Sequence, residues 1–189
     1  MQVRATDPSR PCSVVWGGLP TAAVLAALPD VNVWGVNVYL GASFGTLFEQ
    51  WAATSPLPLW VSEYGVDSYS SELGAEDQPT HAAEMAALAA ELAAHAAATG
   101  GACVGGAAFE FADEWWKYAG GVPWEHDTTA SWYTGGYADA AMHEEWFGLV
   151  SVTREPKLAY AAFAAAPDAT AAACAPPAPP PPAAPPLRP

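Results

Sequence analysis

Short apolar runs alternate with helix-like segments along most of the chain. Branched and aromatic runs, each followed by Gly, Pro or polar residues, predict strands at 12–16, 31–39, 57–63 and 102–111. Ala-rich segments predict helices at 21–28, 77–98 and 156–166, and apolar residues at i, i+3, i+4 and i+7 predict a helix at 43–51. Strands that alternate with helices indicate a parallel sheet covered by helices. The predicted fold class is α/β with four parallel βα units, which form either half of a (βα)8 barrel or an open four-stranded sheet.

Polar side chains end two of these predicted strands. Glu63 ends a run in which Leu59 and Val61 share its parity, so strict alternation would place all three side chains on one face. A buried carboxylate needs polar partners, and catalytic groups of barrels lie at the C-terminal ends of strands. Glu63 is therefore either a catalytic residue or a loop acid that caps the next segment. Asn37 and Tyr39 end the preceding strand and would face the same edge.

The composition divides the chain into one domain and a tail. Residues 1–166 are long enough to bury a core, whereas 167–189 are rich in Ala and Pro and predict a disordered, polyproline-like segment. A half barrel would leave unpaired strand edges at 12–16 and 102–111, which is an aggregation risk. We therefore expect a partner for these edges.

Charge and cysteine usage exclude several classes of function. A formal net charge of −14 argues against nucleic acid and anionic membranes, and no apolar segment is long enough for a membrane span. Cys12, Cys103 and Cys174 show no metal-ligand spacing, and Cys12 and Cys103, which lie in predicted strands, are interpreted as small buried hydrophobes. No cofactor is predicted, and residues 1–11 show no hydrophobic core of a signal peptide.

Histidines and loop acids are the candidate metal ligands of this sequence. The segments His126-Asp127 and His143-Glu144-Glu145 lack a helical His-Glu-x-x-His spacing. Their side chains are therefore interpreted as partners in ion pairs with Lys117 or Arg154, or as contacts to sugar hydroxyls. No metal site is predicted. Asp67 is interpreted as a loop cap, and His81 and His95 as surface residues of the helix at 77–98.

Four motifs in order resemble a known enzyme family. They are Asp7-Pro-Ser-Arg-Pro11, Asn37-Val-Tyr39, Ser62-Glu-Tyr-Gly-Val-Asp67 and Phe109-Glu-Phe-Ala-Asp113. Over about residues 5–165 the chain resembles the C-terminal half of the catalytic barrel of family 2 glycoside hydrolases, the β-glucuronidase and β-galactosidase relatives. The four strands would then be the fifth to eighth of a (βα)8 barrel.

The resemblance implies roles for named residues. Glu63 would be the catalytic nucleophile of a retaining hydrolase that cleaves O-glycosidic bonds of a β-linked glycan, with Asn37 and Tyr39 beside it and the Tyr39 hydroxyl donating to the carboxylate. Glu110 and Asp113 would lie at the sugar subsite. Aromatic and basic residues of the loops are further candidates for carbohydrate binding, namely Trp115, Trp116, Lys117 and Trp146, while Trp124 and Trp132 lie in the same loops and core packing is the alternative for these tryptophans.

Two departures from the family pattern limit what the chain can do alone. Retaining hydrolysis needs two carboxyl groups about 5–5.5 Å apart, and the family's acid/base glutamate follows an asparagine on the fourth strand. This chain contains no Asn-Glu pair, and Phe109 stands where relatives often carry tryptophan. We therefore expect a fragment that is inactive alone and that pairs with the missing N-terminal half of the barrel.

Other functions stay open on the sequence alone. A non-catalytic carbohydrate-binding or scaffold protein could use the tryptophan-rich loops without chemistry, and an unrelated α/β interaction module is a third possibility. A glucuronidase would need a basic group for the substrate carboxylate. Lys117 is the only candidate near the motifs, which favours a neutral glycan.

Overall fold

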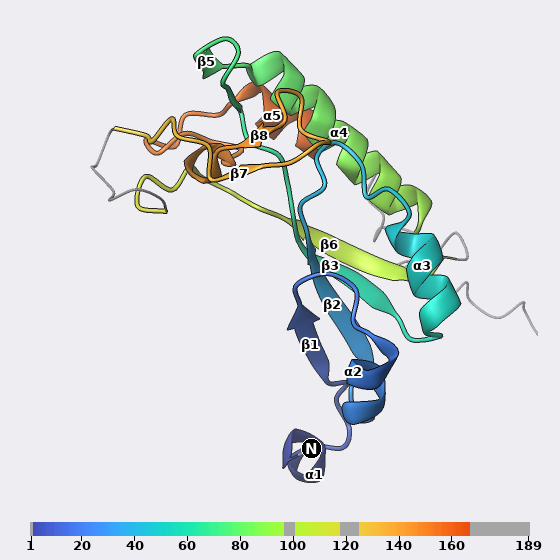
Figure 1. Cartoon of the computed structure of the whole chain (residues 1–189). Coiled ribbons are helices and arrows are strands. Elements are labelled where there is room, and N and C mark those ends of the chain that lie inside the picture. The colour runs from blue at the N-terminus through green and yellow to red at the C-terminus, as the bar shows by residue number, and fades with distance from the viewer. Residues whose placement is uncertain (1, 97–100, 118–124, 167–189) are drawn as a thin grey trace, which may run out of the picture.

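The molecule is an α/β structure built on one parallel sheet. The computed structural model describes residues 2–96, 101–117 and 125–166 (Figure 1). The sheet has the order β1-β2-β3-β6, with bounds Ser13–Trp16, Val33–Val38, Leu59–Tyr64 and Cys103–Ala108. All three pairings are parallel. The predicted α/β class with four parallel strands is therefore confirmed, whereas the predicted tail at 167–189 and Cys174 lie outside the described residues.

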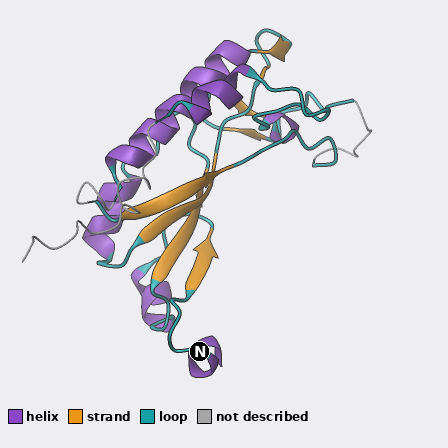
Figure 2. Cartoon of the chain, turned by 180° about the vertical axis from the view of Figure 1, so that it is seen from behind, coloured by secondary structure: helices purple, strands orange, loops and turns teal. Residues whose placement is uncertain are grey.

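Helices cover one face of this sheet. After the short α1 (Gln2–Thr6), the crossovers contain α2 (Ala22–Ala27), α3 (Leu47–Thr54) and α4 (Gln78–Ala94), and α5 (Leu158–Ala164) packs against α4. Figures 1 and 2 show α3 and α4 on the same side of the strands, with the opposite face of the strands uncovered, while α1 lies beyond one end of the sheet. The chain therefore has the layers of half a barrel, in which an outer ring of helices surrounds parallel strands.

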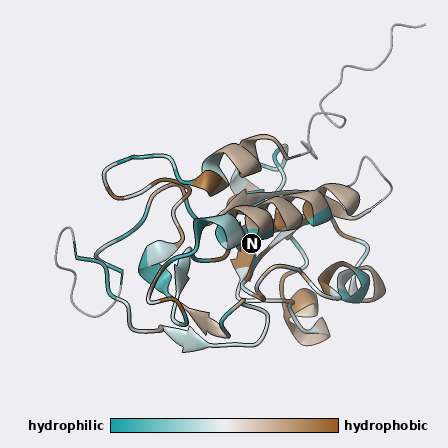
Figure 3. Ribbon diagram, turned by 90° about the horizontal axis from the view of Figure 1, so that it is seen from above, coloured by the Kyte–Doolittle hydropathy of each residue, from teal (hydrophilic) through white to brown (hydrophobic). Residues whose placement is uncertain are grey.

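The core lies between the sheet and the helices. Trp34 and Val36 of β2 and Leu59 and Val61 of β3 are at most 1% exposed, and Trp34 packs against Trp51 of α3 with ring centroids 6.5 Å apart. Seen from above, hydrophobic residues colour much of the long helix, and the hydrophilic colours concentrate in the loops (Figure 3). Among the described residues, no helix has the length and apolarity needed to cross a membrane.

Two loops that appear irregular in sequence contain short antiparallel pairs. The segment after β3 holds β4 (Tyr69–Ser70) and β5 (Ala75–Glu76), and the segment after β6 holds β7 (Trp132–Tyr133), β8 (Ala141–Met142) and the 3-10 turn η2 (Glu144–Trp146). Strands of two residues are too short to show a hydrophobic alternation. The sequence therefore predicted both segments as loops.

Helix α4 corrects the prediction for one histidine. The helix begins where expected, because the Asp77 side chain accepts from the Thr80 amide at 3.2 Å, as an N-cap does. The expectation that His81 lies on the surface is wrong, since the residue is 1% exposed. The helix packs against both the sheet and α5, and its first turns bury His81 and Met85 while Pro79 and Ala83 stay exposed. His95, at the other end, is half-buried and stacks on Phe48.

Candidate active site

A β-bulge determines which way Glu63 points. Val36 pairs with Val61 and the next residue of β2, Asn37, pairs with Glu63, so Ser62 is an extra residue in β3. Burial alternates along β3 up to Val61, repeats at Ser62 and then alternates again. Such a bulge re-aims the side chains that follow it. The predicted shared face of Leu59, Val61 and Glu63 is therefore wrong: Glu63 points away from the helix-covered core, which Leu59 and Val61 occupy.

The bulge brings Glu63 to the residue that ends the neighbouring strand. The Tyr39 hydroxyl donates to Glu63 Oε2 at 2.8 Å, and the Ser62 hydroxyl donates to Asn37 Oδ1 at 2.7 Å. Burial raises the pKa of Tyr39 above its ordinary value, and the Glu63 carboxylate raises it further. Tyr39 therefore stays a hydroxyl donor at any physiological pH. Asn37 serves as a support for the bulge and lines a separate depression on the β1 side of Tyr39.

Glu63 and Tyr39 open into a cavity at the C-terminal end of the sheet. Its volume is about 300 Å³, and its walls are Tyr39, Glu63, Phe109, Lys117, Trp132, Met142, Glu144 and Phe147. The Tyr39 ring meets Phe109 and Phe147 edge-on, with centroids 6.0 and 5.7 Å apart. Aromatic walls around a few polar groups are typical of small-ligand sites. Met142 of β8 and Phe147, the residue after η2, were singled out by no sequence pattern.

One ammonium group and two carboxylates meet at the cavity mouth. Lys117 Nζ lies 3.6 Å from Glu114 Oε2 and 3.7 Å from Glu144 Oε1, and 4.9 Å from the centroid of the Phe109 ring. Burial raises the pKa of Glu144, and the neighbouring Lys117 lowers it. Of the predicted substrate-binding residues, Lys117 is the one that the described structure places in the cavity wall.

Glu110 lies next to this group on the strand-end loop. Its amide donates to the Phe147 carbonyl and its carbonyl accepts from the Leu149 amide, so the backbone position is fixed. Burial raises the pKa of Glu110 to about 9, and the neighbouring Glu114 contributes. Its Oε1 is buried without a hydrogen-bond partner in the described chain. Glu110 does not line the cavity.

Asp113 lies apart from the cavity. It is 3% exposed, accepts from the Gly148 amide at 2.8 Å, and pairs with Lys157 Nζ at 2.7 Å. Lys157 also contacts Glu76 at 2.8 Å and the Ser68 hydroxyl at 2.9 Å. These contacts satisfy the Asp113 carboxylate inside the protein, so the expected contact with a sugar has no support in this geometry. The pair instead ties the strand-end loops to the start of α5.

The predicted tryptophans lie around the cavity rather than in its wall. Trp115 and Trp116 meet edge-on at 5.5 Å, and Trp116 is 56% exposed. Trp146 packs between Tyr69 and His126, and its Nε1 donates to the Asp127 carbonyl. Trp132, which the sequence had only grouped with the loops, is the tryptophan that lines the cavity. Trp124 lies outside the described residues.

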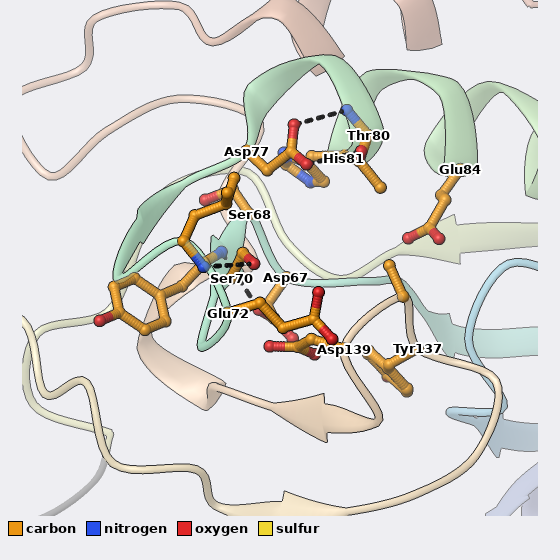
Figure 4. A pocket seen from close by; sticks show the side chains of 13 residues that line it. Asp67, Ser68, Ser70, Glu72, Asp77, Thr80, His81, Glu84, Tyr137 and Asp139 are labelled. Carbon is orange, nitrogen blue, oxygen red and sulfur yellow. Dashed lines mark hydrogen bonds between the residues drawn. The ribbon is translucent and has the colours of Figure 1, made fainter.

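A second pocket, of about 160 Å³, lies behind the loop that follows Glu63 (Figure 4). Five acids line it, namely Asp67, Glu72, Asp77, Glu84 and Asp139. Asp67 accepts from the Tyr69 and His143 amides, which confirms a capping contact. Burial and the nearby acids raise the pKa of Glu84 to about 7. Among the described residues, no three potential ligands converge on a metal position.

Solved glycoside-processing enzymes share this fold. No protein-family model matches the chain, and no curated protein matches it by sequence. A Ruminococcus gnavus β-glucuronidase matches with TM-score 0.50 and 15% identity, over 82% of this chain and 26% of that one. A Rhizomucor miehei β-1,3-glucanosyltransferase mutant, bound to laminaritriose, matches with TM-score 0.52 and 10% identity, over 82% and 52%.

A third match extends the range of activities. A thermostable mutant of a Cellvibrio japonicus xylanase matches with TM-score 0.52 and 14% identity, over 86% of this chain and 51% of that one. The chain thus spans between about a quarter and a half of the length of these three proteins. At such identities the likeness concerns the fold. What the chain shares with these enzymes is four parallel βα units of a glycosidase-like TIM barrel.

Proposed function

We propose that the chain supplies the nucleophile-bearing half of a retaining β-glycosidase barrel of the family 2 type. One observation carries the proposal: the Tyr39 hydroxyl donates at 2.8 Å to Glu63, and both line an aromatic-walled cavity at the C-terminal ends of parallel strands. A barrel places its catalytic groups at this end. The glycosidase-like fold that the chain shares with its structural neighbours supports a catalytic site at this end of the sheet.

The chemistry assigns one step to this chain. Glu63 attacks the anomeric carbon and forms a glycosyl ester, while the glycosidic oxygen leaves with a proton from a second carboxyl group. That second group then takes a proton from water, which attacks the ester and restores the Glu63 carboxylate. Tyr39 holds the carboxylate oxygen in place through a hydrogen bond. The acid/base group belongs to the other half of the barrel, which we propose as the partner of the uncovered face.

Covalent trapping tests the role of Glu63. An activated 2-deoxy-2-fluoro-β-glycoside added to the assembled barrel should label one peptide, and mass spectrometry should place the label on Glu63. Glu63→Gln should remove the label, and the matched change Glu72→Gln, at an exposed acid, should leave it. A label on another residue would contradict the proposal. Turnover by the isolated chain would contradict the assignment of the acid/base to a partner.

A carbohydrate-binding protein without chemistry is the second candidate. Trp132 is 54% exposed although it lines the cavity, so its ring is free to stack on a sugar. Under this alternative Glu63→Gln leaves sugar binding unchanged and the assembled protein turns over no glycoside. Hydrolysis that depends on Glu63 would rule the alternative out.

A further inference from the structure

The charge on the cavity wall restricts the sugar that can enter. Among the described residues that line the cavity, Lys117 carries the one positive charge, whereas Glu63 and Glu144 are acids. Glu114, which does not line the cavity, lies 3.6 Å from the Lys117 ammonium group. An uronic acid would need a cation that is available to its carboxylate.

The Lys117 ammonium group is not available to the carboxylate of a uronic acid. Its ammonium group pairs with two carboxylates, Glu114 at 3.6 Å and Glu144 at 3.7 Å, so both partners compete with any ligand for the same charge. The Phe109 ring covers a further side at 4.9 Å. A ligand carboxylate that approached Lys117 would also approach Glu144, and the two negative charges would repel each other.

We propose that Glu144 is a specificity-determining residue that excludes uronic acids and restricts the cavity to glycosides of uncharged sugars. The inference rests on the proposed function and names its substrate class. Glu144 acts in two ways: its carboxylate pairs with the Lys117 ammonium group, and it adds a negative charge to the cavity that Glu63 also lines. The ligand proposed for this chain therefore differs from that of the β-glucuronidase whose fold the chain shares.

Equilibrium binding of non-hydrolysable ligands tests this inference on the 189-residue chain. Two matched pairs of phenyl 1-thio-β-glycosides serve as probes, the glucoside with the glucuronide and the galactoside with the galacturonide. Quenching of tryptophan fluorescence reports binding, because Trp132 lines the cavity. The unsubstituted chain should bind the uncharged member of a pair about tenfold tighter, and added salt should narrow the difference.

Substitutions separate the effect of Glu144 from that of overall charge. Glu144→Gln should reduce the discrimination several-fold, because it removes one acid and frees Lys117. Lys117→Gln should increase it. Glu72→Gln makes the same charge change at an exposed acid outside this cavity and should leave the ratio unchanged.

The outcomes distinguish this inference from the proposed function. A uronide that binds as tightly as its uncharged partner would overturn the inference while leaving the glycosidase proposal intact. The same holds if Glu144→Gln and Glu72→Gln change the ratio equally. If no thioglycoside binds to the chain, the inference about Glu144 falls, whereas the glycosidase proposal concerns the assembled barrel and is tested separately by covalent trapping of Glu63.

Discussion

At the scale of single residues, the phenol of Tyr39 is the best-defined partner of Glu63. The hydrogen bond is 2.8 Å long and Tyr39 is half-buried, so water replaces the hydroxyl poorly. A hydrogen bond to a charged group contributes about 1.5–3 kcal/mol. The energy of this contact is therefore large enough to matter for both folding and reactivity.

Tyr39→Phe should lower both the stability of the chain and the reactivity of Glu63. We expect the free energy of unfolding of the chain to fall by about 1–2 kcal/mol, because Glu63 loses a donor while the ring contacts stay. Urea denaturation measures this change. In the assembled barrel, labelling of Glu63 by the fluoroglycoside should slow at least tenfold. Unchanged stability and labelling would show that the contact is incidental.

Glu84 gives a second residue-level prediction, on pH. Its pKa is raised to about 7 by burial, Asp67, Asp139 and Asp77, so the folded chain holds this proton more tightly than the unfolded chain does. Stability should therefore fall as the pH rises from about 4.5 to 7. Glu84→Gln removes this dependence. The difference in free energy of unfolding between the variant and the unsubstituted chain should therefore be more favourable to the variant at pH 8 than at pH 4, by about 1 kcal/mol after discounting for solvent screening. If the stability of the two chains depends on pH in the same way, the prediction for Glu84 is wrong.

At the scale of elements, the period of the apolar residues predicts the regular parts of the sheet and its helices. The four strands and α2 to α5 lie within a few residues of their expected positions, because each is long enough to show its period. The two short hairpins and the bulge at Ser62 were not predictable. A single extra residue leaves no mark on composition, yet it reverses the face of Glu63.

Strand order explains how much of the site the sequence could locate. Tyr39 and Glu63 end neighbouring parallel strands, so the βα alternation predicts that they lie at the same edge of the sheet, whereas their direct contact also needs the bulge at Ser62. The pairing of Lys157 with Asp113 joins residues 44 positions apart in loops, and no pattern predicts it. Asp113 was therefore assigned to the substrate, although its carboxylate is occupied within the protein.

The Lys157 network should dominate the stability of the strand-end loops. Lys157 and Asp113 are 4% and 3% exposed, so Lys157→Ala leaves a buried carboxyl group without its ion pair. We expect a loss of about 3 kcal/mol in the free energy of unfolding. Lys117→Ala removes a more exposed lysine with two longer contacts, and should cost less than about 1 kcal/mol. Equal losses in urea denaturation would contradict this ranking.

At the scale of the whole molecule, the sheet is covered on one side only. Parallel sheets are ordinarily buried on both faces, but here the helices cover one face, and β1 pairs with β2 alone in the described chain. Val15 and Trp16 of β1 are 47% and 42% exposed, and Val104 of β6 is 46% exposed. The net charge of −14 opposes association. Apolar edges and like charge therefore act against each other.

We expect the edges to prevail when salt screens the charge, so that the isolated chain self-associates more at high ionic strength. Val15→Lys places a charge on the free edge of β1 and should reduce this association, because a lysine disfavours the addition of another strand. Val3→Lys adds the same charge on α1, where Val3 is 59% exposed, and should have a smaller effect. Light scattering across a salt series compares the three chains. If the two lysine variants behave alike, net charge rather than the open edge controls association, and the sheet does not need a partner for solubility.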